Sequence, residues 1–288
     1  MLLQGKRTLV LEGGGFKTSF STGVLDAFRM TEFDGFDACV GVSGGALALS
    51  YFLSRQYGIY YKSMTTLCKD TRFIQFSKAF TDGLMNLDFF LELAKNEFSF
   101  DIDVAAAQLK SKDFYMVMTQ CDDGRTVYYQ PTIETWMDAI IATSTVPLLT
   151  KGKHLIGGVA YADGGITDPI PIKWVVDQGA TDIVLIRTTH QNFKPSILRP
   201  DFIAAQFIRD NNHIKHAIEN YQQKLKDSID FANNHSKDGL IKQIVPENPL
   251  KTNIFTNSIQ SIIADYRYGL EMGLNFVYEY RKATSSTK

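Results

Sequence analysis

The amino-acid sequence predicts an α/β protein with three layers, in which helices cover both faces of a central, mostly parallel β-sheet. Two observations support this prediction. From Arg7 to Ser54, short β-rich runs alternate with helical segments, and each run ends in a glycine turn that leads into a helix. This alternation is typical of parallel sheets covered by helices. Further along, Asp182–Arg187 (DIVLIR) is apolar between its charged ends, as expected for a strand buried on both faces.

Hydrophobic periodicity and turn residues predict the individual elements. Phe20, Val24 and Phe28 recur on one face of a predicted helix, and the turn Asp122-Asp123-Gly124 predicts a β-hairpin. The predicted strands are Arg7–Glu12, Phe36–Val42, Phe114–Cys121, Arg125–Tyr129, a pair around Leu155–Tyr161, Asp182–Arg187 and Leu240–Val245. The predicted helices are Thr18–Met30, Ala46–Ser54, Ile133–Thr143, Ile172–Gln178, Asp201–Asn234 and Ser258–Tyr280.

Two regions differ from this regular core, which spans residues 7–190. Residues 56–110 mix aromatic and charged residues without strand alternation, so we expect short helices inserted on the sheet. Residues 199–288 are expected to be mainly helical, with a frayed tail over Ala283–Lys288. Because we find no internal repeat and no low-complexity linker, the sequence predicts a single domain over residues 1–288.

Composition excludes two broad classes of protein. The chain has 288 residues, with 30 Lys and Arg against 31 Asp and Glu, a formal net charge of −1. A hydrophobic fraction of 44% with so little net charge excludes a disordered chain. The near-neutral balance also offers no source for the basic surface that electrostatic nucleic-acid binding needs. We therefore expect no nucleic-acid partner.

The sequence shows no marks of export or of membrane insertion. Its start carries basic residues only at Lys6 and Arg7 and then enters a predicted strand, unlike a signal peptide. No segment approaches the ~18 uninterrupted apolar residues of a membrane span. Cys39, Cys68 and Cys121 lack the spacing of a disulfide framework or a zinc site. We therefore expect buried free thiols and a soluble, cytoplasmic protein without a transmembrane segment.

The most specific local motif is Gly41-Val42-Ser43-Gly44-Gly45, a G-x-S-x-G between a predicted strand and a predicted helix. A sharp turn at this place requires small flanking residues and presents the serine hydroxyl above the sheet edge, at the positive end of the helix. Serine is a weak nucleophile without an adjacent base. Ser43 is therefore a candidate nucleophile, and the alternative is a helix-capping serine in a tight turn.

A second glycine turn, Gly13-Gly14-Gly15, ends the neighbouring predicted strand. Successive backbone N–H groups at such a turn can stabilise an oxyanion or bind phosphate. The phosphate alternative fits poorly, because the nucleotide-binding loop G-x-x-x-x-G-K-[ST] would need glycine where Leu11 and Phe16 stand. We therefore expect an oxyanion hole, although a purely structural turn stays open.

A third turn, Asp163-Gly164-Gly165, supplies a candidate base. An aspartate at the end of a strand could lie above the same sheet edge as Ser43, and the alternative is a local turn aspartate. A histidine for a Ser-Asp-His triad would have to follow Asp163, and His190 is the candidate by position. Because Ser43 follows only the second predicted strand, a Ser43/Asp163 dyad is preferred over the triad.

These three turns, in this order, resemble the patatin-like phospholipase family. The resemblance covers residues ~7–190, and its further matches include ATSTVP at Ala142–Pro147 and DGGITDPIP at Asp163–Pro171. It implies a patatin-like fold in which Ser43 is the nucleophile and Asp163 accepts its proton. The loop Gly13–Gly15, together with Gly44, would form the oxyanion hole. It also implies acyl esters of lipids as substrates (phospholipids, lysophospholipids or acylglycerols), with no metal and no cofactor.

The sequence departs from the family pattern in the oxyanion loop. The family motif G-G-G-x-R-G has arginine and glycine where this chain has Lys17 and Thr18. Lysine keeps the charge but loses the planar donor fork of arginine, so we expect an effect on substrate handling rather than on the chemistry. Two alternatives stay open: an α/β-hydrolase-type esterase with a Ser43-Asp163-His190 triad, and a non-catalytic lipid-binding relative.

The aromatic insert also allows two interpretations. Segments such as Leu84–Ala94 could form an acyl-chain pocket or a membrane-facing lid, which would bring the chain into peripheral contact with a membrane surface. They could equally be an ordinary helical cover over the sheet.

Overall fold

The computed structural model describes residues 1–75, 83–147, 149–150, 152–198, 200–208 and 211–285. Its centre is an eight-stranded sheet with the order β5-β6-β3-β2-β1-β7-β8, and β4 pairs with β3 in addition. The pairs β1–β2, β1–β7, β2–β3 and β7–β8 are parallel. The pairs that involve β4, β5 and β6 are antiparallel. The predicted mostly parallel α/β sheet is therefore confirmed.

The elements follow the predicted order closely. The strands are β1 Arg7–Leu11, β2 Ala38–Val42, β3 Asp113–Gln120, β4 Thr126–Tyr129, β5 His154–Ile156, β6 Val159–Asp163, β7 Asp182–Ile186 and β8 Ile241–Ile244. The helices up to β7 are α1 Thr18–Met30, α2 Gly44–Leu53, α3 Ile59–Leu67, α4 Leu87–Asn96, α5 Ile102–Gln108, α6 Trp136–Ser144 and α7 Ile172–Asp177. The C-terminal helices are α8 Pro200–Ala205, α9 Asn212–Glu219, α10 Tyr221–Lys237 and α11 Ile259–Ser285.

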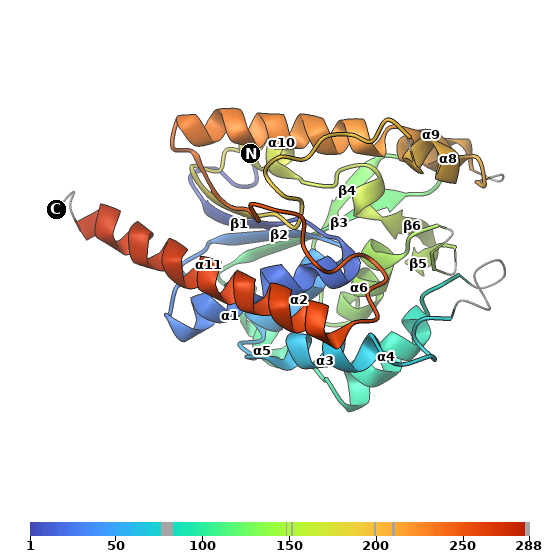
Figure 1. Cartoon of the computed structure of the whole chain (residues 1–288), viewed down its shortest axis with the longest axis horizontal. Coiled ribbons are helices and arrows are strands. Elements are labelled where there is room, and N and C mark those ends of the chain that lie inside the picture. Colours follow the sequence, from blue (N-terminus) through green and yellow to red (C-terminus); the bar gives the residue numbers. More distant parts are fainter. Residues whose placement is uncertain (76–82, 148, 151, 199, 209–210, 286–288) are drawn as a thin grey trace.

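Helices cover the sheet on both faces (Figure 1). Alternate strand residues point to opposite sides, so Leu9 and Val184 pack against α1, α2 and α11. Val10 and Ile183 pack on the other side against α7 and α10. The C-terminal region takes part in both layers, because β8 extends the sheet beside β7 and α11 lies along α1.

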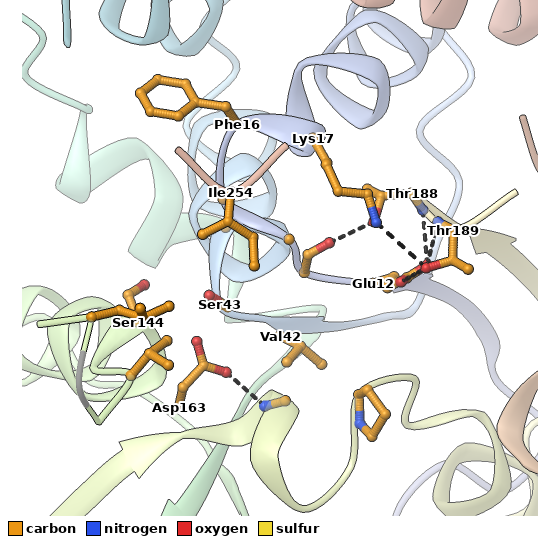
Figure 2. Close-up of a pocket in the computed structure, with 18 of the residues that line it drawn as sticks. Glu12, Phe16, Lys17, Val42, Ser43, Ser144, Asp163, Thr188, Thr189 and Ile254 are labelled. Atoms are coloured by element: carbon orange, nitrogen blue, oxygen red, sulfur yellow. Dashed lines mark hydrogen bonds between the residues drawn. The ribbon is translucent and has the colours of Figure 1, made fainter. Parts of the chain in front are cut away.

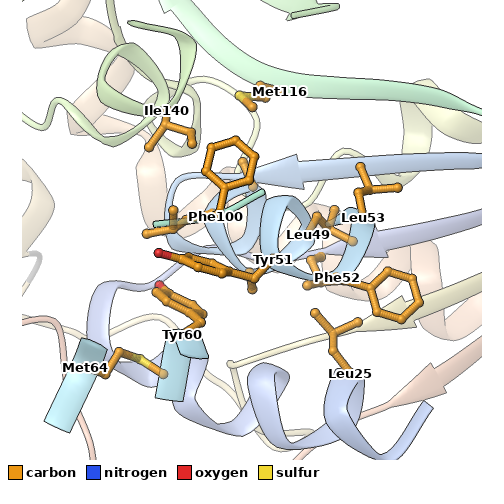
Figure 3. Packing of buried hydrophobic residues seen from close by; sticks show 14 of the residues in the cluster. Leu25, Leu49, Tyr51, Phe52, Leu53, Tyr60, Met64, Phe100, Met116 and Ile140 are labelled. Atoms are coloured by element: carbon orange, nitrogen blue, oxygen red, sulfur yellow. The ribbon is translucent and has the colours of Figure 1, made fainter. Parts of the chain in front are cut away.

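The insert is helical, as predicted, and its described residues form α3, α4 and α5; residues 76–82 lie outside the described part of the chain. Its large side chains pack onto α2 and α6, with Tyr51 of α2 stacked on Tyr60 of α3 (Figure 3). In α4, Phe89, Phe90 and Leu93 are all buried. The apolar face of α4 is therefore buried against the rest of the protein, which favours the interpretation as a helical cover and pocket wall over a membrane-facing lid.

One long helix over Asp201–Asn234 was predicted, and this prediction is wrong. The described residues form three helices instead, α8, α9 and α10. Asn211 begins α9, because its side chain accepts a hydrogen bond from the Ile214 N–H at 2.9 Å. Asn220 separates α9 from α10 and donates its side-chain amide to the His216 carbonyl at 2.9 Å. Asparagine competes with the helix for its backbone hydrogen bonds, and amphipathic periodicity alone does not register such a break.

The tail differs from the prediction as well. Helix α11 continues to Ser285, where the Thr284 and Ser285 hydroxyls donate to the Arg281 carbonyl; residues 286–288 lie outside the described part. Cys39, Cys68 and Cys121 are buried free thiols, as predicted. Within the described residues, no helix combines the length and the apolar character that crossing a bilayer requires.

Candidate functional site

The three glycine turns come together at one edge of the sheet. In the register of the strands, Val42 lies beside Val117, and the next residue of β3, Met118, lies beside Asp163. Asp163, the last residue of β6, therefore lies at the same height along the sheet as Ser43. It does so although β6 runs antiparallel to β3. Gly13, at the end of β1, lies next to the turn that carries Ser43, on the side of β2 away from β3.

The backbone of Ser43 is held in a strained conformation. Its φ and ψ are 52° and −128°, a region that residues with a side chain adopt at a cost. The Ser43 N–H donates to the Thr143 hydroxyl at 3.0 Å, and this hydroxyl donates to the Val117 carbonyl at 2.6 Å. Gly45 allows close packing, because a methyl group there would lie 2.6 Å from the Glu12 carbonyl oxygen. This turn, residues 41–45, carries the candidate nucleophile, and we call it the nucleophile elbow.

Asp163 is buried and its carboxyl group points toward Ser43 (Figure 2). One carboxyl oxygen accepts the Gly165 N–H at 2.6 Å. The Thr119 hydroxyl donates to the Asp163 carbonyl at 2.9 Å, which fixes the backbone. Burial raises the pKa of Asp163 to about 6, while hydrogen bonds from the Ser43 side chain and from Gly165 act to lower it. A carboxylate with this pKa can hold a proton during a reaction near neutral pH.

The candidate oxyanion loop, residues 13–17, is held by a hydroxyl on each side. On one side, the Thr188 hydroxyl donates to the Gly13 carbonyl at 2.7 Å. Because a trans peptide group is planar, this bond turns the Gly14 N–H away from Thr188. Gly14 and Gly15 have positive φ angles of 128° and 57°, and their amides donate to no acceptor among the described residues. Both glycines line the pocket beside Ser43.

Thr18 holds the other side of the loop. Its hydroxyl donates to the Gly15 carbonyl at 2.7 Å and lies 3.0 Å from the Tyr60 hydroxyl. Tyr60 in turn donates to the Gly44 carbonyl at 3.4 Å. The side chain that replaces the family's glycine therefore ties the oxyanion loop to the elbow helix α2 and to α3 of the insert. Lys17, at the family's arginine position, reaches the Thr189 hydroxyl at 3.5 Å.

A buried carboxylate supports the loop from behind. Glu12, only 4% exposed, accepts the backbone N–H groups of Thr188 and Thr189 at 2.8 and 2.9 Å. The Thr189 hydroxyl also donates to this carboxylate. Because Thr188 carries the hydroxyl that holds Gly13, Glu12 fixes the oxyanion loop through the start of the segment that follows β7. Figure 2 shows these bonds.

His190 lines the same pocket but has no hydrogen bond to Ser43 or Asp163. Its Nδ1 atom is buried and has no hydrogen-bond partner among the described residues. Burial and the positive charges of Lys17 and Arg187 lower its pKa. The Asp163 carboxyl group accepts the Gly165 N–H and points toward Ser43. The structure therefore brings Ser43 and Asp163 together without His190 between them.

Ser43 and Asp163 line a pocket of about 740 Å³, within the usual range for small-molecule sites. The insert supplies one wall, which is apolar and includes Tyr60, Met64, Leu67, Phe73 and Phe90. The chain after β7 supplies the other wall, which is more polar and includes Thr189, His190, Lys194, Tyr221 and Gln222. Ser43 lies where the two walls meet at the sheet edge.

Sequence reasoning missed the supports of the site. Thr143, Glu12 and Thr188 are not catalytic candidates by motif, and Thr188 is far from Gly13 in the chain. One signal was available for Glu12, an acidic residue that directly continues an apolar strand. A carboxylate in that place must be buried and needs donors.

Comparisons with known proteins find a family, one curated relative and one solved structure. The model of the family described as "Patatin-like phospholipase" matches residues 9–175, and a "Domain of unknown function (DUF6363)" matches residues 211–285. The uncharacterized protein YjjU of Escherichia coli (strain K12) is 30% identical over 279 residues, which are 95% of this chain and 77% of that protein. VipD from Legionella pneumophila, a solved structure, matches with a TM-score of 0.45 and 13% identity, over 95% of this chain and 67% of that one.

Proposed function

Since the chain belongs to the patatin-like phospholipase family, we propose that it is a serine hydrolase that cleaves fatty-acyl esters of lipids with a Ser43/Asp163 dyad. One observation carries the proposal. The Asp163 carboxyl group is buried and points toward Ser43, beside a loop in which the Gly14 and Gly15 amides have no acceptor among the described residues.

In the acylation step, Asp163 accepts the Ser43 proton while the serine oxygen attacks the ester carbonyl carbon. The carbonyl oxygen becomes an oxyanion, which the N–H groups of Gly14, Gly15 and Gly44 stabilise. Gly13, the first residue of the proposed oxyanion hole, also lets the loop pack against the elbow, because a methyl group there would lie 2.8 Å from the Val42 carbonyl oxygen. When the tetrahedral intermediate collapses, Asp163 returns the proton to the leaving alcohol. One such donor typically contributes ~10²–10³-fold in rate.

In the second step, water replaces the alcohol. Asp163 accepts a proton from this water, and the resulting hydroxide attacks the acyl-serine ester. A second oxyanion forms at the same amides. Its collapse releases the fatty acid and returns the proton from Asp163 to Ser43, so that the enzyme is regenerated.

The walls of the pocket indicate how a lipid would lie. The insert wall is lined by aromatic and aliphatic side chains, which suit an acyl chain. The wall after β7 carries hydroxyl, amide and basic side chains, which suit a polar leaving group. Because lipid esters of this kind reside in membranes, the proposal includes peripheral contact with a membrane surface.

A chain-length series tests this function. Wild type and Ser43→Ala are compared on p-nitrophenyl acyl esters of increasing length and on a phospholipid in mixed micelles. We expect hydrolysis that improves from short to medium or long chains and falls by about 10³-fold or more in Ser43→Ala. Lack of hydrolysis by wild type on every ester, or full activity of Ser43→Ala, would favour the non-catalytic lipid-binding alternative.

A further inference from the structure

The segment of residues 193–207, between β7 and α9, exposes an unusual number of large apolar side chains. Four of them are more than half exposed: Ile197 (98%), Leu198 (80%), Ile203 (55%) and Phe207 (64%). Large apolar side chains exposed within one short stretch of chain point to a site of interaction, because their contact with water is unfavourable. By contrast, the insert helix α4 buries its aromatic side chains.

The same segment also forms part of the pocket wall. Phe193, Lys194, Ser196, Pro200 and Ala204 line the pocket, while the four exposed residues do not. In α8, Ala205 is buried toward the protein and Ala204 faces the pocket, whereas Ile203 faces solvent. One short stretch of chain therefore has one side on the substrate pocket and the other on open apolar surface.

We propose that these four side chains form a docking face that inserts into the surface of a phospholipid bilayer and holds the pocket against the lipid. This proposal rests on the proposed function, since it assigns the membrane contact of that same site. In Figure 1, α8 lies at the end of the molecule opposite the C-terminus, together with β5, whose Leu155 is 58% exposed.

Charge favours a bilayer as the occupant. Lys194 is exposed and has no ion pair among the described residues, so its ammonium group is free for an anionic headgroup. The one acid described in this segment, Asp201, accepts hydrogen bonds from the Gln222 backbone and side chain. Apolar side chains beside a free lysine are the combination that binds the interface of anionic membranes.

Vesicle flotation tests the docking face without relying on catalysis. The Ser43→Ala protein is mixed with vesicles of phosphatidylcholine alone or with added phosphatidylglycerol. We expect binding to both, with tighter binding to the anionic vesicles. Ile197→Ser/Leu198→Ser should lower the vesicle partition at least about tenfold, since burying one aliphatic side chain in lipid is worth more than that factor.

A matched control separates this face from general surface hydrophobicity. Met30→Ser/Tyr278→Ser removes two side chains that are 56% and 65% exposed elsewhere on the molecule, and we expect unchanged binding. Insertion is measured directly with Ile197→Trp and Tyr278→Trp in vesicles that contain brominated lipid. Quenching of the first variant alone would support the proposal.

Four outcomes would overturn the docking face: no vesicle binding, equal binding by the patch and control variants, equal quenching of both tryptophans, or a dimer that only the patch variants abolish. The proposed function is tested separately with soluble short-chain esters. A protein that keeps Ser43 and carries Ile197→Ser/Leu198→Ser should cleave these esters at the wild-type rate. Ester hydrolysis without vesicle binding would contradict the docking face alone, and vesicle binding without hydrolysis would contradict the proposed function alone.

Discussion

The nucleophile elbow and the oxyanion loop are both glycine-rich turns between a strand and a helix, but different forces hold them. The elbow has one bond to a hydroxyl, from the Ser43 N–H to Thr143, but close packing also fixes it, because Gly45 leaves no room for a side chain beside the Glu12 carbonyl. The oxyanion loop is fixed by hydroxyl groups, with Thr188 on Gly13 and Thr18 on Gly15. Any side chain added at a tightly packed glycine causes a clash, whereas one substitution can remove a single hydrogen bond and leave the others in place. The elbow should therefore tolerate no change, while the loop should respond in steps.

The largest effect should come from Gly45→Ala. Its methyl group would meet the carbonyl oxygens of Glu12 and Leu11, at and just after the end of β1, at 2.6 and 3.0 Å, so either this segment or α2 must move. We expect destabilisation of about 1–3 kcal/mol or more and loss of ester hydrolysis, measured by thermal unfolding and by p-nitrophenyl ester assay. Gly35→Ala is the matched control, since its methyl group would meet only the end of the Arg7 side chain at 3.5 Å. A stable, active Gly45→Ala protein would contradict the steric account of the elbow.

Thr188→Val should have the next largest effect. It keeps the shape of the side chain and removes the hydroxyl that holds the Gly13 carbonyl. With the Gly14 amide no longer oriented, we expect kcat to fall about 10- to 10²-fold, with little change in KM. Thr188→Ser should restore most of the rate. If valine and serine lower kcat equally, the hydroxyl does not orient the loop.

The pH dependence of ester hydrolysis distinguishes the roles of Asp163 and Glu12, the buried carboxylates beside the two turns. Asp163 must be ionised to accept a proton, and its pKa in the free protein is raised to about 6, so kcat/KM should fall about tenfold for each pH unit below 6 and level off above it. Glu12→Gln should lower the plateau through the loop but leave the midpoint at about 6. A midpoint that moves with Glu12→Gln, or that stays near pH 4 in wild type, would argue against Asp163 as the base.

Thr18→Val should have the smallest effect. It removes one hydrogen bond to Gly15 and one contact with Tyr60, for which we expect a loss of about tenfold or less in kcat. Thr18→Ser keeps the hydroxyl and is the control. Thr18→Gly, which restores the family residue, should behave like Thr18→Val. Wild-type kinetics in both hydroxyl-free variants would show that the bridge to the insert does not position the loop.

The two turns also show how far a sequence can predict such a site. Ser43, Asp163 and the Gly13–Gly15 loop could be proposed because each lies in a local pattern of strand, glycine turn and helix. Local signals likewise predicted the order of strands and helices, and the helix over Thr18–Met30 was predicted with the bounds it has.

Local sequence patterns could not predict the residues that support the site, because these residues join parts of the chain that are distant in sequence. Thr188 reaches Gly13, and Thr143 reaches Ser43, only once the sheet has formed. For the same reason the sequence could not distinguish which apolar segment would be buried. Phe90 of the insert is 6% exposed and Phe207 is 64% exposed, although both lie in amphipathic surroundings.

The most direct test of the dyad is one comparison of ester hydrolysis by Asp163→Asn and His190→Ala, at a pH above 7 where Asp163 is ionised. The dyad predicts that Asp163→Asn loses about 10³-fold or more of the wild-type kcat, and that His190→Ala keeps a rate close to wild type. The opposite pattern, or an equal loss in both variants, would contradict the dyad and point to a triad that includes His190.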